Sequence, residues 1–461
     1  MGPVWRRGVD SLLRFAPQRR LAVIAALTAP VWLLPEPVGR YAGLSVLVLL
    51  LLAAAVDLLL LPPRAALGVE REFPGSVGIG DDAEGTYTVF NRTGRRITVE
   101  LHDRLPVLVR GGASGSPDSG AGATRGATLM PVPASSAQAL TVPLTGKARG
   151  VAPLGPLGVR VSSALGLVAA RYTFETTDSI RVIPSLSGVR RYRLLAMQHR
   201  LGAMGIRVLR QKGQGQAFAN LREYVRGDDP RHIDWKATSK KGKFITREFT
   251  VERSQTVITL VDAGRGMTQL SGEFSRFEHA LSSALILTDI ASAGGDRVGT
   301  LVFDDEVRAF VPPQASRGAL HLVRDAFIPV VATTREPDYA SAFRFLAAHQ
   351  GKRALVVFFT DVIDVRASQA LLAHVTRSAA RHLVLVVALR NDALFEASRP
   401  RDAASPVALF ESSAAEELIQ ARDEVLERMR RAGVIVLDVS PQTMTAGVVN
   451  RYLELKARGA L

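Results

Sequence analysis

Hydrophobic residues form two long runs near the N-terminus. The first run, Leu21–Leu34, is broken only by a Thr and a Pro, and the second, Tyr41–Leu61, only by a Ser and Asp57. About 20 apolar residues suffice to cross the hydrocarbon core of a membrane. The first run also has the length of a signal peptide, but no small-residue cleavage site follows it. The pattern predicts an N-terminal tail and two transmembrane helices in residues 1–66.

The charges around these runs indicate the orientation of the chain in the membrane. Five arginines precede the first run, the connecting loop contains only Arg40, and Arg64 and Arg71 follow the second run. Cytoplasmic flanks carry the excess of Lys and Arg. We therefore expect a multi-pass protein of the cytoplasmic membrane, with both ends and the soluble domains in the cytoplasm.

Residues 67–188 show short alternating runs, among them Thr86–Phe90 and Ile97–Leu101, separated by turns rich in Gly, Pro and Asn. Short strands with regular turn signals predict a β-sandwich. The Gly- and Ser-rich segment Gly111–Gly126 reads as a flexible loop within it.

Residues 255–461 alternate apolar runs with helical patterns. The expected strands are Val257–Val261, Val298–Phe303, Ala354–Phe359, Leu383–Leu389 and Val434–Val439. The expected helices are Ser275–Ala293, Ala319–Phe327, Tyr339–His349, Ser368–Ala379, Ala414–Arg431 and Ala446–Lys456. This alternation predicts a doubly wound α/β domain, a parallel sheet with helices on both faces.

Four acidic residues stand at predicted strand ends: Asp262, Asp304, Asp361 and Asp438. In open α/β sheets, ligands bind outside the carboxyl ends of the strands. An Asp there can also cap the following helix, and this interpretation suits Asp438 best.

Between the β-rich and α/β regions, residues 189–254 are dense in charge, with aromatic residues among the charges. A salt-bridged surface hairpin would explain the composition, and so would a polar network held against a packed core. The segment carries a run of the form G-x-G-x-x-F-x-x-L-R-x-Y-x-x-G-D-D-x-R-x-I-D-W-K. It matches at Gly213, Gly215, Phe218, Leu221, Arg222, Tyr224, Gly227, Asp228, Asp229, Arg231, Ile233, Asp234, Trp235 and Lys236.

This run resembles the signature of the domain-of-unknown-function 58 family. The resemblance implies a membrane-tethered protein with an immunoglobulin-like module and a von Willebrand factor A-like domain, and a MoxR-type AAA+ ATPase as partner. It assigns signature or binding roles to Arg222, Tyr224, Gly227, Asp228, Asp229, Arg231, Asp234, Trp235 and Lys236. We expect Asp234 and Trp235 to be structural, fixing the joint between the two soluble modules.

A von Willebrand factor A-like domain also implies a metal site of the form D-x-S-x-S, completed by a later Thr and Asp. Here Gly264 and Gly266 stand at the serine positions after Asp262, and Pro337 stands near the expected Thr. Asp361 is the remaining acid, and Mg²⁺ needs several oxygen ligands. We expect a degenerate site that binds no metal, and no cofactor.

Composition narrows the function classes further. The chain has no Cys, which excludes disulfides and thiol catalysis, and it carries a formal net charge of +15. Its basic residues are spread along the whole chain. No P-loop or nucleophile elbow occurs in the sequence. We expect a non-enzymatic, membrane-anchored scaffold or adaptor for envelope-associated complexes. The alternatives are a phosphate-ester hydrolase using the signature acids and a basic nucleic-acid binder.

Overall fold

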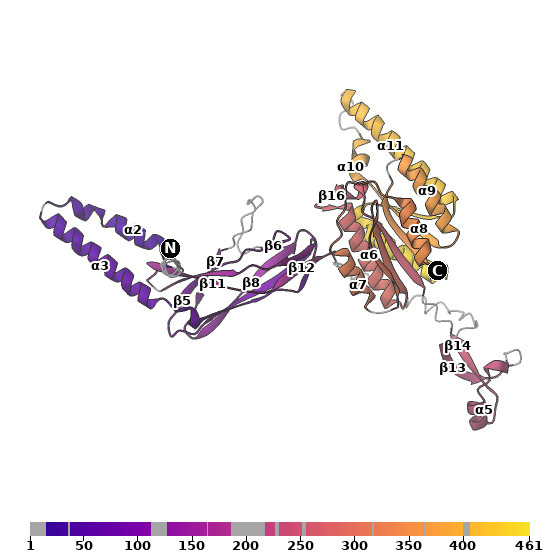
Figure 1. The fold of residues 1–461 in the computed structure, drawn as a ribbon, viewed down its shortest axis with the longest axis horizontal. Helices are drawn as coiled ribbons and strands as arrows, with labels where there is room; N and C mark the ends of the chain where they lie inside the picture. The colour runs from indigo at the N-terminus through magenta and orange to yellow at the C-terminus, as the bar shows by residue number, and fades with distance from the viewer. Residues whose placement is uncertain are drawn as a thin grey trace, which may run out of the picture. The chain divides into compact units, whose positions relative to one another are not determined.

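The computed structural model describes residues 15–35, 37–111, 127–163, 165–185, 217–225, 230–250, 255–315, 318–362, 365–399 and 406–461. The chain divides into two compact units, Met1–Ser185 and Leu186–Leu461 (Figure 1). The first contains apolar helices and a β-rich part, and the second contains a mixed α/β domain. The succession of an apolar helix, a β-rich region and an α/β region agrees with the sequence pattern.

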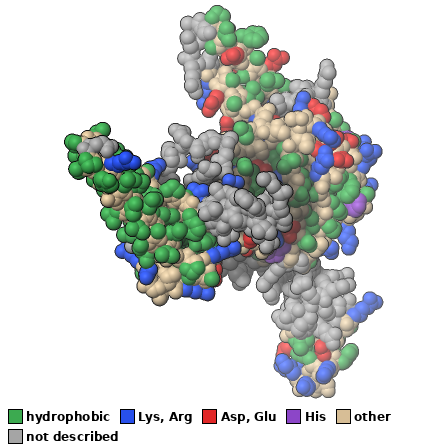
Figure 2. All heavy atoms as spheres, turned by 60° about the vertical axis from the view of Figure 1, so that its left-hand side comes forward, with side chains coloured by type: hydrophobic (Ala, Val, Ile, Leu, Met, Phe, Trp, Pro, Cys, Tyr) green, Lys and Arg blue, Asp and Glu red, His purple; other side chains and the backbone are tan. Residues whose placement is uncertain are grey.

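Helix α3 (Val38–Leu60) is the one helix in the described part of the chain that is long and apolar enough to cross a membrane. Large apolar side chains along it are exposed, among them Leu49, Leu52 and Leu59. Figure 2 shows hydrophobic side chains covering much of this end of the molecule. The second predicted span therefore has the length and the surface of a membrane helix.

The first predicted span, Leu21–Leu34, is not a continuous helix. It consists of α2 (Arg19–Leu27) and a short 3-10 helix (Ala29–Leu33) with Pro30 in its first turn. Proline has no N–H to donate and disfavours a helical conformation at the residue before it. At about 1.5 Å per residue, nine helical residues rise about 14 Å, roughly half of a bilayer core.

The β-rich part contains sheets with the strand orders β1-β11-β10-β5-β7, β2-β4-β8-β6 and β3-β12-β9. The strands are β1 (Phe15–Pro17), β2 (Leu67–Glu72), β3 (Ser76–Gly78), β4 (Asp82–Asn91), β5 (Ile97–His102), β6 (Val109–Gly111), β7 (Ala127–Val132), β8 (Ser136–Gly146), β9 (Gly150–Pro153), β10 (Leu157–Ser162), β11 (Val168–Phe174) and β12 (Ser179–Ile183). Buried and half-exposed residues alternate along β5 and β10, which gives this sheet one core face. Almost all of the predicted Gly/Ser loop lies outside the described residues.

The C-terminal end of α3 is fastened to this β-rich part through Asp57. Asp57 is fully buried and accepts hydrogen bonds from the backbone N–H groups of Leu167 and Val168, each at 2.7 Å, and from the Ser163 hydroxyl. Strand β1, which precedes α2, pairs with the same strand β11. Both ends of the helical segment therefore meet one edge of the β-rich part.

Residues 217–225 and 230–250, the part of the signature segment that the structure describes, form a small hairpin within the second unit. Strands β13 (Ala217–Glu223) and β14 (Ile245–Thr250) pair antiparallel, and a 3-10 turn (Pro230–His232) and helix α5 (Trp235–Lys241) lie between them. The surface-hairpin interpretation of this segment thus describes its local structure.

A six-stranded sheet forms the centre of the α/β domain, in the order β19-β18-β15-β20-β21-β22. The strands are β15 (Thr256–Asp262), β18 (Arg297–Phe303), β19 (Val307–Gln314), β20 (Leu355–Asp361), β21 (Leu383–Leu389) and β22 (Ile435–Val439). All neighbouring pairs are parallel except β18 and β19, which are antiparallel. The sequence pattern missed β19 because it contains two prolines, which an edge strand tolerates.

Helices cover both faces of this sheet, as the sequence pattern predicts (Figure 1). One core packs under α6 (Arg276–Ala293), α7 (Ala319–Phe327) and α12 (Pro441–Ala457). The other packs under α8 (Tyr339–His349), α9 (Val365–Ala379) and α11 (Pro406–Arg431). A short helix, α10 (Asp392–Ala397), and the small hairpin of β16 (Leu270–Ser271) and β17 (Phe274–Ser275) complete the domain.

Candidate functional site

The carboxyl edge of the sheet has one topological switch point, between β15 and β20. The chain leaves β15 towards β18 on one side, whereas β20 is followed by β21 on the other. Open α/β sheets place their ligand sites at this position. Asp262 ends β15 and Asp361 ends β20, so the structure brings these two sequence-predicted acids to the switch point.

Neutral donors surround Asp262. Its Oδ1 accepts the backbone N–H of Gly264 at 2.7 Å, and its Oδ2 accepts the hydroxyls of Thr360 at 2.7 Å and Tyr339 at 3.3 Å. Burial raises the pKa of Asp262 to about 6, against the opposing effect of these hydrogen bonds. The carboxylate therefore holds the loop after β15 and the start of α8 against the end of β20.

Asp361 is paired with a buried guanidinium. Arg276, the first residue of α6, places Nη1 2.5 Å from Oδ2 of Asp361, and both side chains are almost fully buried. Burial raises the pKa of Asp361 to about 6, although Arg276 and Arg422 both oppose the shift. Because the positive charge comes from the chain itself, Asp361 has its counter-ion without any bound cation.

The residues at this edge do not fit a divalent metal ion. A Cβ at Gly264 would lie 2.8 Å from Cδ of Pro337 and 3.0 Å from the backbone oxygen of Arg335. A Cβ at Gly266 would lie 3.0 Å from Oδ2 of Asp361. A side chain at Gly264 would therefore displace its neighbours, and one at Gly266 would need the Asp361 side chain to shift. In the described residues no three His, Asp or Glu side chains cluster as metal ligands.

The other two strand-end acids also have arginine partners. Asp304 accepts two hydrogen bonds of 2.8 Å from Nε of Arg308, and burial alone would raise its pKa, but these bonds hold the pKa below its ordinary value. Asp438 pairs with Arg422 at 2.7 Å and with Arg390 at 3.2 Å. The helix-cap interpretation of Asp438 is wrong, because Ser440 is the N-cap residue of α12.

Several of the predicted signature residues belong to the β13–β14 hairpin. Asp234 is the N-cap of α5, where Oδ1 accepts the backbone N–H of Ala237 at 3.0 Å, so its structural role is local. Trp235 was expected to be buried in a joint between modules, but it is 66% exposed and its ring meets only the edge of Phe244 among the described aromatic contacts. Of the other signature residues, Tyr224 is half-buried, and Arg231 and Lys236 are exposed. For Arg222 the structure describes the backbone alone. Gly227, Asp228 and Asp229 lie outside the described residues.

Three aromatic side chains of the hairpin form a cluster. Tyr224 is half-buried, whereas Trp235 and Phe244 are 66% and 56% exposed. The Phe244 ring lies 6.4 Å from the rings of both Tyr224 and Trp235, in edge-to-face geometry. We call Tyr224, Trp235 and Phe244 the aromatic cluster of the hairpin.

Sequence reasoning missed the two buried arginines of the carboxyl edge, although each left a signal. Arg276 is a cation in the first turn of a helix, where the helix dipole favours anions, so it needs a nearby carboxylate. Arg422 recurs at helical spacing with the buried residues Val425, Leu426 and Met429, so it lies on the core face of α11. A charged residue at a core position requires a partner, which Asp438 supplies.

Comparison with known proteins relates the chain to uncharacterized sequences. Residues 220–425 match the family described as "Protein of unknown function DUF58". The uncharacterized protein Rv1480 of Mycobacterium tuberculosis is 26% identical over 200 residues, which cover 42% of this chain and 58% of that protein. The uncharacterized protein YeaD of Bacillus subtilis is 24% identical over 185 residues, covering 39% of this chain and 44% of YeaD. The chain thus spans less than two thirds of these relatives and resembles the DUF58 family over its hairpin and most of its α/β domain.

Proposed function

We infer that this protein is a membrane-anchored adaptor that binds another protein through the aromatic cluster of its signature hairpin. The observation that carries the proposal is the exposure of Trp235 and Phe244. Tryptophan and tyrosine are enriched in the energetic centres of protein interfaces. A two-stranded hairpin is also marginally stable by itself in water, so a surface of this kind gains stability when a partner covers it.

The charges around the cluster indicate the chemistry of the partner. The exposed lysines Lys236, Lys240, Lys241 and Lys243 are close in sequence to Trp235 and Phe244. Lys243 has an ion pair with Glu223 at 3.2 Å, and both side chains are highly exposed. Exposed lysines so close in sequence to exposed aromatic residues suit a partner whose binding surface carries acidic groups, and complementary charges of this kind accelerate association.

The resemblance to the domain-of-unknown-function 58 family suggests a MoxR-type AAA+ ATPase as this partner, in the assembly or remodelling of envelope-associated complexes. A von Willebrand factor A-like fold for residues 255–461 is part of the proposal. It is supported by a parallel sheet whose one antiparallel strand, β19, lies at the edge. An immunoglobulin-like fold for the β-rich part is supported by its antiparallel sheets with alternating buried positions.

We also propose that the N-terminal helices form a membrane hairpin with the soluble domains in the cytoplasm. Support comes from strand β1, before α2, and from the end of α3, which both attach to the region of β11. Five arginines before the first apolar run and one in the connecting loop favour cytoplasmic ends. A C-terminal reporter that is active only outside the cytoplasm would overturn this orientation.

The adaptor proposal is tested by purifying the full chain from native membranes with nucleotide and Mg²⁺ present. We expect an AAA+ ATPase to co-purify, and the double variant Trp235→Ala/Phe244→Ala to reduce its recovery at least tenfold. Phe410→Ala is a matched control, because Phe410 is a 76% exposed aromatic residue on α11. Recovery of no ATPase, or equal recovery with the double variant, contradicts the proposal. Recovery of nucleic acid instead would favour the basic nucleic-acid binder.

The hydrolase alternative places its catalysis on Asp228, Asp229, Asp234 and Lys236. Of these, Asp234 already accepts a backbone hydrogen bond as a helix cap, which suits a structural role. No observation favours the hydrolase over the adaptor, because Asp228 and Asp229 lie outside the described residues.

A further inference from the structure

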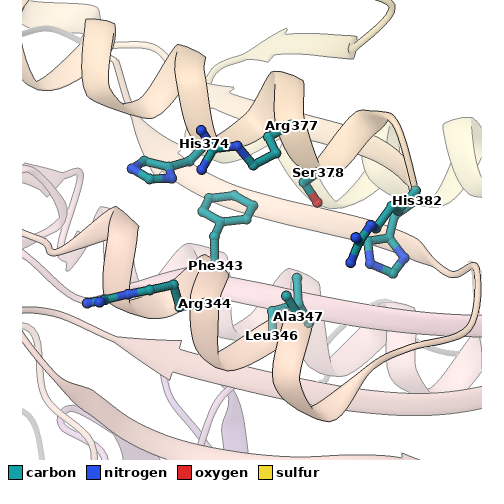
Figure 3. A pocket seen from close by; sticks show the side chains of 9 residues that line it. Phe343, Arg344, Leu346, Ala347, His374, Arg377, Ser378 and His382 are labelled. Carbon is teal, nitrogen blue, oxygen red and sulfur yellow. The ribbon is translucent and has the colours of Figure 1, made fainter.

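A cavity of about 260 Å³ lies between α8 and α9, away from the carboxyl edge of the sheet (Figure 3). Its lining includes the C-terminal halves of both helices and His382, which directly precedes β21 and therefore marks the amino edge. Phe343, Leu346 and Ala347 supply its apolar wall. The Phe343 ring lies 6.2 Å from the His374 ring with the two planes only 11° apart. The cavity thus offers one compact apolar surface.

Three arginines line the same cavity, and no acidic residue does: Arg344, Arg377 and Arg381. Arg377 and Arg381 are exposed, and neither guanidinium has an ion pair or a hydrogen bond to any residue that the structure describes. The C-terminal ends of α8 and α9 contribute about half a negative charge each through their dipoles. These dipoles offset only part of three full positive charges, so the cavity remains cationic.

Polar groups inside the cavity can complete the recognition of an anion. The Ser378 hydroxyl belongs to the lining, and so does His382, whose side chain is buried. Nδ1 of His382 has no hydrogen-bond partner among the described residues. Burial, and then the charge of Arg381, lower the pKa of His382, so the imidazole is neutral at pH 7 and offers one donor.

We propose that this cavity binds a small organic phosphate, a monophosphate ester with a compact aromatic or apolar body. The planar guanidinium of Arg matches phosphate oxygens in bidentate geometry, and two unpaired guanidinium groups balance a dianionic phosphate. The body of the ligand lies on Phe343 in this arrangement. Ligand pockets for drug-sized molecules span roughly 300–1,000 Å³, so a smaller cavity restricts the ligand to about one ring with its phosphate.

This site is independent of the adaptor function, because it shares no residue with the aromatic cluster of the hairpin or with the carboxyl edge. The test is isothermal titration calorimetry on the full chain in detergent, with phenyl phosphate as the probe. We expect one site per chain, and we expect Arg377→Gln/Arg381→Gln to weaken binding at least tenfold. Both side chains are exposed, so the fold should tolerate the change. Arg451→Gln, on α12 over the opposite face of the sheet, should change the affinity less than twofold.

Two further probes separate the parts of the proposal. Inorganic phosphate should bind at least tenfold more weakly than phenyl phosphate, because it lacks the body that contacts Phe343. Benzoate should also bind more weakly, because a carboxylate carries one charge. The proposal is overturned if phenyl phosphate gives no binding, if the double variant binds it as tightly as the native protein, or if inorganic phosphate binds equally well.

Discussion

The Arg276–Asp361 pair gives the sharpest test of how the carboxyl edge is held together. Replacing Arg276 with Met keeps an unbranched apolar stem but removes the guanidinium, so Asp361 stays buried without this counter-ion. Removing one partner of a buried ion pair costs about 3–5 kcal/mol. The two side chains are 2% and 6% exposed, so water cannot solvate the remaining charge. We therefore expect Arg276→Met to destabilise the domain by an amount in this range, which raises the equilibrium constant for opening of the sheet core at least 100-fold.

The opposite replacement, Asp361→Asn, leaves the buried guanidinium of Arg276 without its carboxylate partner and should destabilise the domain for the same reason. In the double variant Arg276→Met/Asp361→Asn neither charge is left unpaired. Its destabilisation should be smaller than the sum of the two single effects by about 2–3 kcal/mol, the upper part of the range for side chains in direct contact.

Hydrogen–deuterium exchange of peptides from β20 in the full chain measures these differences, because β20 is central in the sheet and fully buried along most of its length. A matched control is Arg451→Gln, which removes only an exposed ion pair with Glu454. Two results would refute the reasoning. The first is a destabilisation of Arg276→Met below about 1 kcal/mol, and the second is a destabilisation of the double variant that equals the sum of the two single ones to within about 0.5 kcal/mol. Protection of β20 that depends on Mg²⁺ and disappears in Asp361→Asn would show that Asp361 binds a metal ion instead.

Two other predictions concern buried carboxylates. The folded-state pKa of Asp262 is raised to about 6, so its contribution to stability is present below the unfolded value near 3.9 and is lost as the pH rises through 6. When the pH falls from 7.5 to 5, the free energy of unfolding of the native protein should therefore rise by about 1.3 kcal/mol relative to that of Asp262→Asn. Hydrogen–deuterium exchange of β15 amides measures this difference. A difference between the two proteins that does not change with pH would contradict the raised pKa. Asp57→Leu leaves the buried N–H groups of Leu167 and Val168 without their acceptor, at about 1–3 kcal/mol each, and should accelerate exchange in β11 at least tenfold. Asp57→Asn retains an acceptor oxygen and should accelerate exchange less. Equal exchange in β11 of both variants would show that Asp57 does not act as the acceptor of these N–H groups.

In the α/β domain, the sequence predicts the ends of a helix well where apolar residues recur at one regular spacing. Helices α7 and α8 begin and end at the predicted residues, because each has a regular apolar stripe and a clear end. Helix α11 begins at Pro406, eight residues before the predicted start, since its first part carries exposed apolar residues such as Phe410 and shows no single core face. Strand β19 was missed because its prolines are compatible only with an edge position, which depends on the tertiary arrangement.

The candidate site was only partly predictable for a related reason. Strand ends identified Asp262 and Asp361, since parallel strands bring their carboxyl ends to one edge. The partner Arg276 comes from a helix that packs there only in the folded domain, so local pattern alone does not pair it with Asp361. For Trp235, an aromatic residue among charges predicts a buried anchor, whereas the structure leaves the side chain 66% exposed. Its role in a joint between the soluble modules stays a prediction.

Gly264, Gly266 and Arg276 together explain why binding is expected on exposed surfaces and not at the switch point. The two glycines allow the loop after β15 to approach Pro337 and Asp361 closely, and Arg276 supplies the positive charge at the end of β20. A side chain at Gly264 would displace the loop from Pro337, and the loss of Arg276 would remove the ion pair that compensates Asp361. At this edge the charge of Asp361 is compensated by the chain itself, through the ion pair with Arg276. This is consistent with our proposal that a partner binds elsewhere, at the accessible aromatic cluster of the hairpin.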